Sequence, residues 1–170
     1  MFTNDQFGPS VVPETPNPRV TIQDTEIEVL FSPDDLVVSR LAQLLGEAQE
    51  SIYFLTYSFT SDQLGIILRD KASQGVSIVG VMEATQLNLD STSEYDLFKQ
   101  AGLDVRLGHT SGLINHKMII IDNRIVVVGS YDFTNRAENE NDENVMILHN
   151  ADIAEKFMEE FQRIQSRAQP

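Results

Sequence analysis

The chain of 170 residues contains no cysteine and no long hydrophobic run. The absence of cysteine excludes disulfides, thiolate zinc sites and cysteine nucleophiles. No stretch approaches the roughly 18 apolar residues that a membrane-spanning helix needs. Residues 1–20 also lack the apolar core of a signal peptide. We therefore expect a soluble chain, either cytoplasmic or exported from a longer precursor.

Positive charge is also scarce, because 12 Lys and Arg residues stand against 26 Asp and Glu residues. The formal net charge of −14 opposes non-specific association with nucleic acid or anionic lipid over most of the surface. Any phosphate-bearing partner must therefore be bound locally. The length and a hydrophobic content of 41% are those of one globular domain with a sizeable core.

Four of the six prolines lie in residues 1–20, which have no apolar periodicity. Residues 1–25 are therefore expected to form a Pro-rich arm or linker, and residues 26–170 the folded domain. The alternative is an ordered arm that packs on the domain.

From residue 26 onward, strand-like and helix-like patterns alternate along the chain. Strands are expected at 26–31, 51–59 and 77–84, and the helices that follow them at 34–49, 61–75 and 93–102. This order predicts an α/β fold with a parallel sheet and helices on its faces.

The pattern changes after residue 104, where two apolar strands, 115–122 and 125–130, are joined by a very short link. So short a link requires an antiparallel hairpin that turns at or close to Asn123-Arg124, and Asn123 tolerates the left-handed conformation of such turns. One more strand is expected at 143–148, followed by a C-terminal helix that Asn150 can cap.

Polar side chains gather at one end of this hairpin. Successive side chains of a strand face opposite ways, so Asn115 and Lys117 share one face while His116 points to the other. The return strand brings Ser130 and Asp132 towards the same end of the sheet. The alternative interpretation is that these are ordinary solvent-facing groups at strand ends.

The hairpin resembles the signature of the phospholipase D superfamily, which reads His, any residue, Lys, four residues, Asp, and later Gly-Ser-x-Asn. Lys117, Asp122, Gly129 and Ser130 match it, and DENVMIL resembles the Glu-Asn strand downstream. The length, with one motif over residues 115–132, is similar to that of the small bacterial nuclease branch. The resemblance implies a phospholipase D-like mixed sheet with helices on both faces, and a metal-independent phosphodiesterase without cofactors.

In that family the signature histidine is the nucleophile and forms a phosphohistidine, and the histidine of a second motif is the general acid and then the base. The resemblance implies that Lys117 stabilises a phosphate oxygen, Ser130 donates a hydrogen bond, and Glu143 orients the nucleophilic ring. Asp122 is expected to buttress the hairpin. The acidic segment 138–144 is expected to be a solvated loop rather than a calcium site.

Two positions depart from the signature, because Asn115 occupies the nucleophile's place and Asp132 stands where the family has Asn. A carboxamide is not nucleophilic, so we expect this chain to be inactive or strongly impaired. A carboxylate in a phosphate pocket repels its ligand unless Lys117 or a proton compensates. Asn115 is explained equally well by a deliberate inactivating substitution and by a natural pseudoenzyme.

The predicted function is that of a nuclease-like phosphodiesterase with a phosphohistidine mechanism, disabled at its nucleophile. Nucleic acid is the first expected substrate and phospholipid the second, although the sequence has no amphipathic interfacial helix. The alternative from another class is a non-catalytic binding or interaction module. Because the family's reaction needs two motifs across one pocket, we expect a homodimer with both Lys117 side chains near its twofold axis. The other possibility is a second motif-bearing domain in a longer chain.

Overall fold

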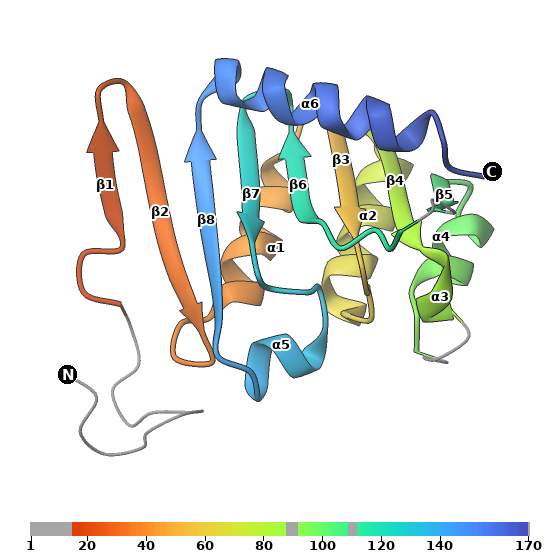
Figure 1. Ribbon diagram of the computed structural model, residues 1–170, viewed down its shortest axis with the longest axis horizontal. Helices are drawn as coiled ribbons and strands as arrows, with labels where there is room; N and C mark the ends of the chain where they lie inside the picture. Colours follow the sequence, from red (N-terminus) through yellow and green to blue (C-terminus); the bar gives the residue numbers. More distant parts are fainter. Residues whose placement is uncertain (1–14, 88–91, 109–111, 170) are drawn as a thin grey trace.

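Eight strands of the described residues form one mixed sheet, in the order β1-β2-β8-β7-β6-β3-β4-β5 (Figure 1). The structure is a computed structural model that describes residues 15–87, 92–108 and 112–169. The strands are β1 (Arg19–Ile22), β2 (Thr25–Ser32), β3 (Ser51–Thr56), β4 (Ser77–Glu83), β5 (Asp104–Gly108), β6 (Lys117–Ile121), β7 (Ile125–Gly129) and β8 (Glu143–His149). The helices are α1 (Val37–Glu47), α2 (Asp62–Ser73), α3 (Ala84–Leu87), α4 (Tyr95–Gln100), α5 (Asn135–Asn139) and α6 (Ala151–Gln165).

The sheet is parallel only where β3, β4 and β5 adjoin. The expectation of a parallel sheet throughout the first half is therefore wrong for β2, which pairs antiparallel with β8. The reason lies downstream: the hairpin β6–β7 adds to the free edge of β3, and β8 then adds to β7, so these three strands separate β2 from β3. The mixed sheet implied by the family resemblance is confirmed.

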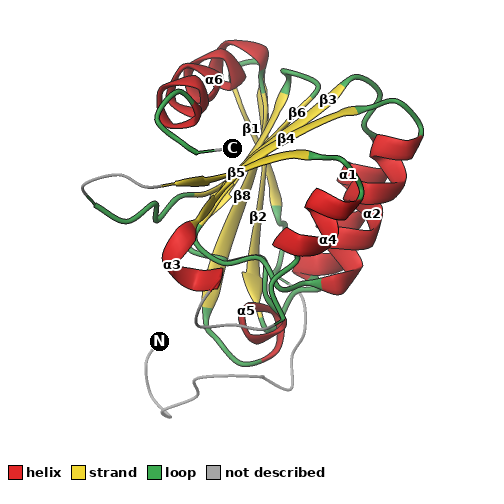
Figure 2. Cartoon of the chain, turned by 90° about the vertical axis from the view of Figure 1, so that its right-hand side faces the viewer, coloured by secondary structure: helices red, strands yellow, loops and turns green. Residues whose placement is uncertain are grey.

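Helices cover both faces of the sheet, as expected. Helices α1, α2 and α4 lie on one face and α6 crosses the other (Figure 2). The predicted helix ends follow from their capping residues. The Ser61 side chain accepts a hydrogen bond from the amide of Leu64, Gly75 has a positive φ of 94° just after α2, and Asn150 accepts from the amide of Ile153 at 3.0 Å.

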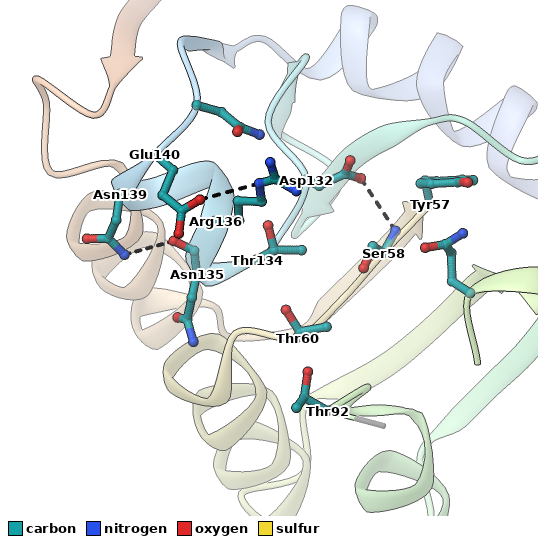
Figure 3. A pocket seen from close by; sticks show the side chains of 12 residues that line it. Tyr57, Ser58, Thr60, Thr92, Asp132, Thr134, Asn135, Arg136, Asn139 and Glu140 are labelled. Atoms are coloured by element: carbon teal, nitrogen blue, oxygen red, sulfur yellow. Dashed lines mark hydrogen bonds and ion pairs between the residues drawn. The ribbon is translucent and has the colours of Figure 1, made fainter. Parts of the chain in front are cut away.

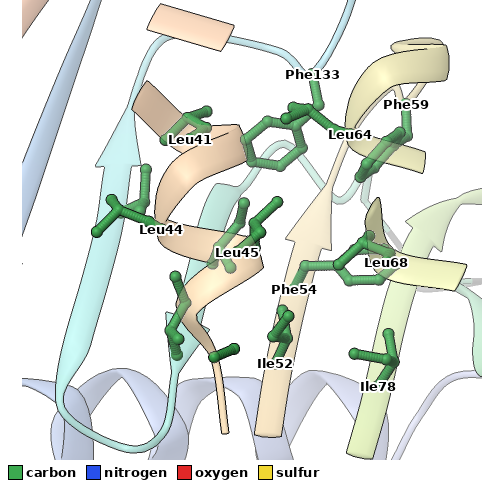
Figure 4. Packing of buried hydrophobic residues seen from close by; sticks show 14 of the residues in the cluster. Leu41, Leu44, Leu45, Ile52, Phe54, Phe59, Leu64, Leu68, Ile78 and Phe133 are labelled. Carbon is green, nitrogen blue, oxygen red and sulfur yellow. The ribbon is translucent and has the colours of Figure 1, made fainter. Parts of the chain in front are cut away.

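The larger of two apolar clusters fixes the loops that carry the polar residues. It lies between the sheet and α1, α2 and α4 (Figure 4). There the ring of Phe59, after β3, lies 5.4 Å from the ring of Phe133, after β7. The carbonyl of Phe133 also accepts hydrogen bonds from the amides of Thr60 and Ser61 at 2.9 and 3.0 Å. These contacts hold together the segments that follow β3 and β7, although β6 separates the two strands in the sheet.

Two segments differ from the sequence-based expectation. Residues 19–22, assigned to the arm, form the edge strand β1, so the sheet begins before residue 25. All four residues of β1 are exposed, which explains why no alternation of buried positions revealed the strand. The acidic segment 138–144 is not a loop throughout, because α5 includes Glu138 and β8 begins at Glu143. The rest of the expected arm, residues 1–14, lies outside the described residues.

Candidate active site

The β6–β7 turn is held by Asp122, at the end of β6 opposite Lys117. Asp122 and Asn123 have positive φ values of 50° and 52°, which places the turn one residue earlier than Asn123-Arg124. The Asp122 carboxylate accepts hydrogen bonds from three consecutive backbone amides at 2.8–2.9 Å, those of residues 49–51. Burial alone would raise the pKa of Asp122, but these hydrogen bonds outweigh it and lower the pKa. Asp122 thus ties the hairpin to β3, far from the other polar residues.

Lys117 lies at the start of β6, where it gathers the first polar cluster. Its ammonium donates a hydrogen bond to the Oδ1 of Asn115 at 2.6 Å and forms an ion pair with Asp132 at 3.4 Å. The ammonium also lies 5.3 Å from the centre of the Tyr57 ring, within the range of a cation–π contact. Lys117 is thus a mostly buried cation with polar partners on three sides.

The surroundings of Asp132 raise the pKa of its carboxyl group. Its Oδ1 accepts a long hydrogen bond of 3.4 Å from the amide of Ser58. Burial raises the pKa of Asp132, and the ion pair with Lys117 only partly opposes this; the nearby negative charge of Glu143 raises the pKa further. A carboxyl of this kind takes up a proton at a less acidic pH than an exposed aspartate.

Ser130 and Glu143 form the second polar cluster, at the facing ends of β7 and β8. The Ser130 hydroxyl donates a hydrogen bond to Glu143 and accepts one from the amide of Asn144 at 3.1 Å. Gly129, just before Ser130, allows this approach, because a β-carbon there would collide with the carbonyl oxygen of Asn144. The Gly-Ser pair of the motif therefore has a steric reason in this fold.

His116 lies apart from both clusters. Its Nε2 lies 3.0 Å from the Oε1 of Glu160, on α6, across the sheet from Lys117. His116 therefore lies on the opposite face from Asn115 and Lys117, as the strand alternation predicts. The strand β6 itself begins only at Lys117.

The site thus contains Asn115, Lys117 and Asp132 in direct contact, with Ser130 and Glu143 in a neighbouring cluster. Sequence reasoning missed Tyr57 and Ser58, because the apolar run 51–59 was interpreted as one strand, whereas β3 ends at Thr56. The signal that could have found them is their position after the carboxyl end of a strand, where α/β proteins commonly place ligand-binding residues.

One group of potential metal ligands exists among the described residues, and it is remote from Lys117. Oxygen and nitrogen atoms of Glu26, Glu28 and His149 lie within 4.8 Å of one another, at the end of β8 opposite Glu143. Glu28 is already engaged by Arg40 and His149. The cluster is fully explained by these ion pairs, and the absence of a metal from the mechanism stays a prediction.

A mixed sheet with helices on both faces, and a lysine hairpin followed by Gly-Ser at the strand ends, defines a domain of the phospholipase D-like phosphodiesterase class. The chain belongs to the family described as "Cardiolipin synthase, PLD-like domain", which matches residues 41–165.

Individual relatives agree with this assignment. The chain is 31% identical over 133 residues to a mitochondrial cardiolipin hydrolase of Mus musculus and 32% identical over 133 residues to that of Homo sapiens. These matches cover 78% of this chain but only 60% and 52% of the relatives. A phospholipase D of Rickettsia bellii is 24% identical over 164 residues, covering 93% of this chain and 81% of that protein.

Solved structures share the fold. Nuc from Salmonella typhimurium, a phospholipase D family member, matches with a TM-score of 0.78 and 26% identity, covering 85% of this chain and 97% of that one. NucT from Helicobacter pylori matches with the same TM-score at 20% identity, covering 85% and 98% of the two chains. Among the described residues, no helix combines the length and apolar character needed to span a bilayer.

Proposed function

We propose that this chain binds a phosphodiester at Lys117 and is strongly impaired in hydrolysing it. The observation that carries the proposal is the hydrogen bond of 2.6 Å between Lys117 and the Oδ1 of Asn115, the residue at the nucleophile position. A carboxamide there keeps a polar contact with the lysine, yet it offers no lone pair basic enough to attack phosphorus. Binding and chemistry are thereby separated: Lys117 still provides a cation, and no group replaces the imidazole.

The active form of this scaffold acts by phosphohistidine chemistry without a metal. In that reaction Lys117 neutralises charge on a phosphate oxygen, and Ser130 adds a hydrogen bond. Glu143, which accepts a hydrogen bond from Ser130, would orient a histidine ring at position 115. Asp122 acts on the fold alone, through the three amides that it holds.

The charges around the pocket favour a ligand with one phosphodiester group over a polyanionic strand. Lys117 is paired with Asp132, and Arg136, the cation among the described residues that line the neighbouring pocket, is paired with Glu140 at 3.4 Å. A nucleic acid strand needs several unpaired cations along its backbone. Nucleic acid, the first substrate expected from the sequence, is therefore less well supported than a phospholipid headgroup, which also agrees with the relatives that are named as a cardiolipin hydrolase and a phospholipase D.

A homodimer completes the proposal. The family's reaction uses two motifs across one pocket, and this chain has one motif, so a twofold axis near Lys117 would bring two copies together. Each copy would supply its own Lys117 and its own residue 115. A second motif-bearing domain in a longer chain is the other arrangement that meets this need.

Restoring the nucleophile tests the proposal. Asn115→His should turn over bis(p-nitrophenyl) phosphate without added metal, because loss of a nucleophile costs on the order of a millionfold in a coupled catalytic unit. Lys117→Ala in the restored protein should abolish the gain. His116→Ala should have little effect, since that ring contacts α6 on the opposite face.

Two results would contradict the proposal. Efficient metal-independent turnover by the unaltered chain would disprove its impairment. If the Asn115→His protein folds and dimerises but has no activity on single-stranded DNA, phospholipid or the generic diester, the enzyme interpretation is wrong. The chain would then be an interaction module.

A further inference from the structure

A polar pocket of about 590 Å³ opens beside the Lys117 cluster (Figure 3). Its walls come from the residues after β3, from α3, and from the segment between β7 and β8 that includes α5. The volume lies within the range of about 300 to 1,000 Å³ that is usual for small-molecule sites. The pocket is therefore large enough for more than a phosphate group.

The pocket begins where the proposed phosphate site ends. Asp132 lines the pocket and is also the ion-pair partner of Lys117. Tyr57 lines it as well, and the Lys117 ammonium lies 5.3 Å from the centre of that ring. A diester whose phosphate contacts Lys117 would therefore direct one of its two ester substituents into this pocket.

The lining is composed mainly of uncharged hydroxyl and amide groups. The side chains of Ser58, Thr60, Gln86 and Asn135 make no hydrogen bond to any described residue. Thr60 is the most informative, because it is only 8% exposed and its hydroxyl points into the pocket (Figure 3). A hydroxyl held at the wall of a pocket on a largely buried residue can bond a ligand there without ordering a long side chain.

The same lining argues against two other ligand classes. Its guanidinium, Arg136, is paired with Glu140 and is 74% exposed, so the described lining offers no unpaired cation for a second phosphate. The residues of the lining that the structure describes include no aliphatic side chain of Leu, Ile, Val or Met that would receive an acyl chain. Groups that both donate and accept hydrogen bonds fit a ligand with the same property.

We propose that this pocket binds the neutral, hydroxyl-rich substituent of the phosphodiester, a sugar or polyol. The inference rests on the proposed function, because Lys117 must hold the phosphate for the substituent to reach the pocket. Ser58, Thr60, Gln86 and Asn135, which all line the pocket, would supply the hydrogen bonds to these hydroxyls. The pocket thereby selects among diesters that Lys117 alone would not distinguish.

Three diester probes test the ligand class, with binding measured by calorimetry. Dimethyl phosphate reports the phosphate site alone, glycerophosphoglycerol adds a polyol, and dibutyl phosphate adds an apolar chain of similar length. We expect glycerophosphoglycerol to bind at least about tenfold more tightly than dimethyl phosphate, and dibutyl phosphate to gain little. A ribodinucleoside monophosphate and its 2′-deoxy counterpart then distinguish a ribose from a glycerol source of the hydroxyls.

Thr60→Val tests the pocket itself, because it removes the hydroxyl while keeping the shape of the side chain. It should weaken glycerophosphoglycerol about fivefold to tenfold and leave dimethyl phosphate unchanged. Thr21→Val, on the exposed strand β1, is the matched control and should change neither. Asn135→Ala, at an exposed position of the lining, repeats the test without altering the core.

The outcomes separate this inference from the proposed function. If dimethyl phosphate binds and depends on Lys117, but glycerophosphoglycerol binds no more tightly, the polyol pocket is wrong and the phosphate site stands. Equal weakening of both ligands by Thr60→Val would also overturn the pocket. If none of the diesters binds, the proposed function fails, and the inference fails with it.

Discussion

The ion pair between Lys117 and Asp132 should limit how tightly this chain binds an anion. A phosphodiester that contacts Lys117 must compete with a carboxylate already 3.4 Å from the ammonium. Asp132→Asn removes that charge and keeps an oxygen that can accept from the amide of Ser58. We therefore expect Asp132→Asn to tighten diester binding near neutral pH.

The size of the gain follows from Coulomb's law. If the diester and the carboxylate both contact the Lys117 ammonium, their charges lie about 6 Å apart, and they repel by about 0.7 to 3 kcal/mol at effective dielectric constants of about 80 to 20. The side chains of Lys117 and Asp132 are 12% and 26% exposed, so solvent screens part of this. A relief of about 1 to 2 kcal/mol corresponds to about 5- to 30-fold in Kd.

The direction in which diester affinity changes with pH tests the same competition. Burial raises the pKa of Asp132, so the unaltered chain should bind more tightly as pH falls and the carboxyl takes up a proton. Asp132→Asn should flatten this dependence and match the low-pH affinity throughout. Dimethyl phosphate is the suitable ligand, because its single charge stays constant between about pH 5 and about pH 8.

Asp104→Asn is the matched control, because it removes one negative charge from a carboxylate that is paired with Arg106 on β5. It should leave both the affinity and its pH dependence unchanged. If Asp132→Asn behaves like Asp104→Asn, the carboxylate does not compete for Lys117, and the charge argument for the site is refuted.

Two further predictions concern stability and assembly. Asp122→Ala should lower the free energy of unfolding by about 2 to 4 kcal/mol in urea titrations, because three amides lose their acceptor and alanine tolerates the positive φ poorly. Hydrogen bonds lower the folded-state pKa of Asp122 despite its burial, so its stabilisation is present above about pH 4 and is lost as pH falls through that lowered pKa. Asp122→Asn should lack this acid sensitivity. An Asp122→Asn protein that is equally sensitive to acid would contradict the role given to Asp122. Sedimentation at micromolar concentration should give a dimer, and a monomer alone would favour a longer two-motif chain.

The hairpin was predictable from the sequence because its constraints are local. The link of three residues between β6 and β7 is short enough to allow only an antiparallel pairing, and the strand period of two then assigns Lys117 and His116 to opposite faces. The ends of α2 and α6 were predictable for the same reason, since Ser61 and Asn150 cap the helices that they precede. Local chemistry determined each of these features.

Non-local pairings were not predictable in the same way. The contact of β2 with β8 joins residues more than a hundred positions apart, and no local pattern distinguishes it from a pairing with β3. Tyr57 and Ser58 were hidden because β-rich residues continue past the end of the strand at Thr56. The polar pocket was missed because its walls come from segments far apart in the sequence, which are joined by non-local contacts such as that between Phe59 and Phe133.

Under the proposed function, the placement of residue 115 would allow the scaffold to lose its nucleophile and keep its fold. Asn115 is exposed and precedes β6, outside both apolar clusters. Substitutions at such surface positions usually change stability by less than about 0.5 kcal/mol. Asp122, by contrast, holds three amides, and Gly129 leaves no room for a side chain. The motif therefore contains positions that folding constrains and, under the proposed function, one that only catalysis would constrain, which is the position of Asn115.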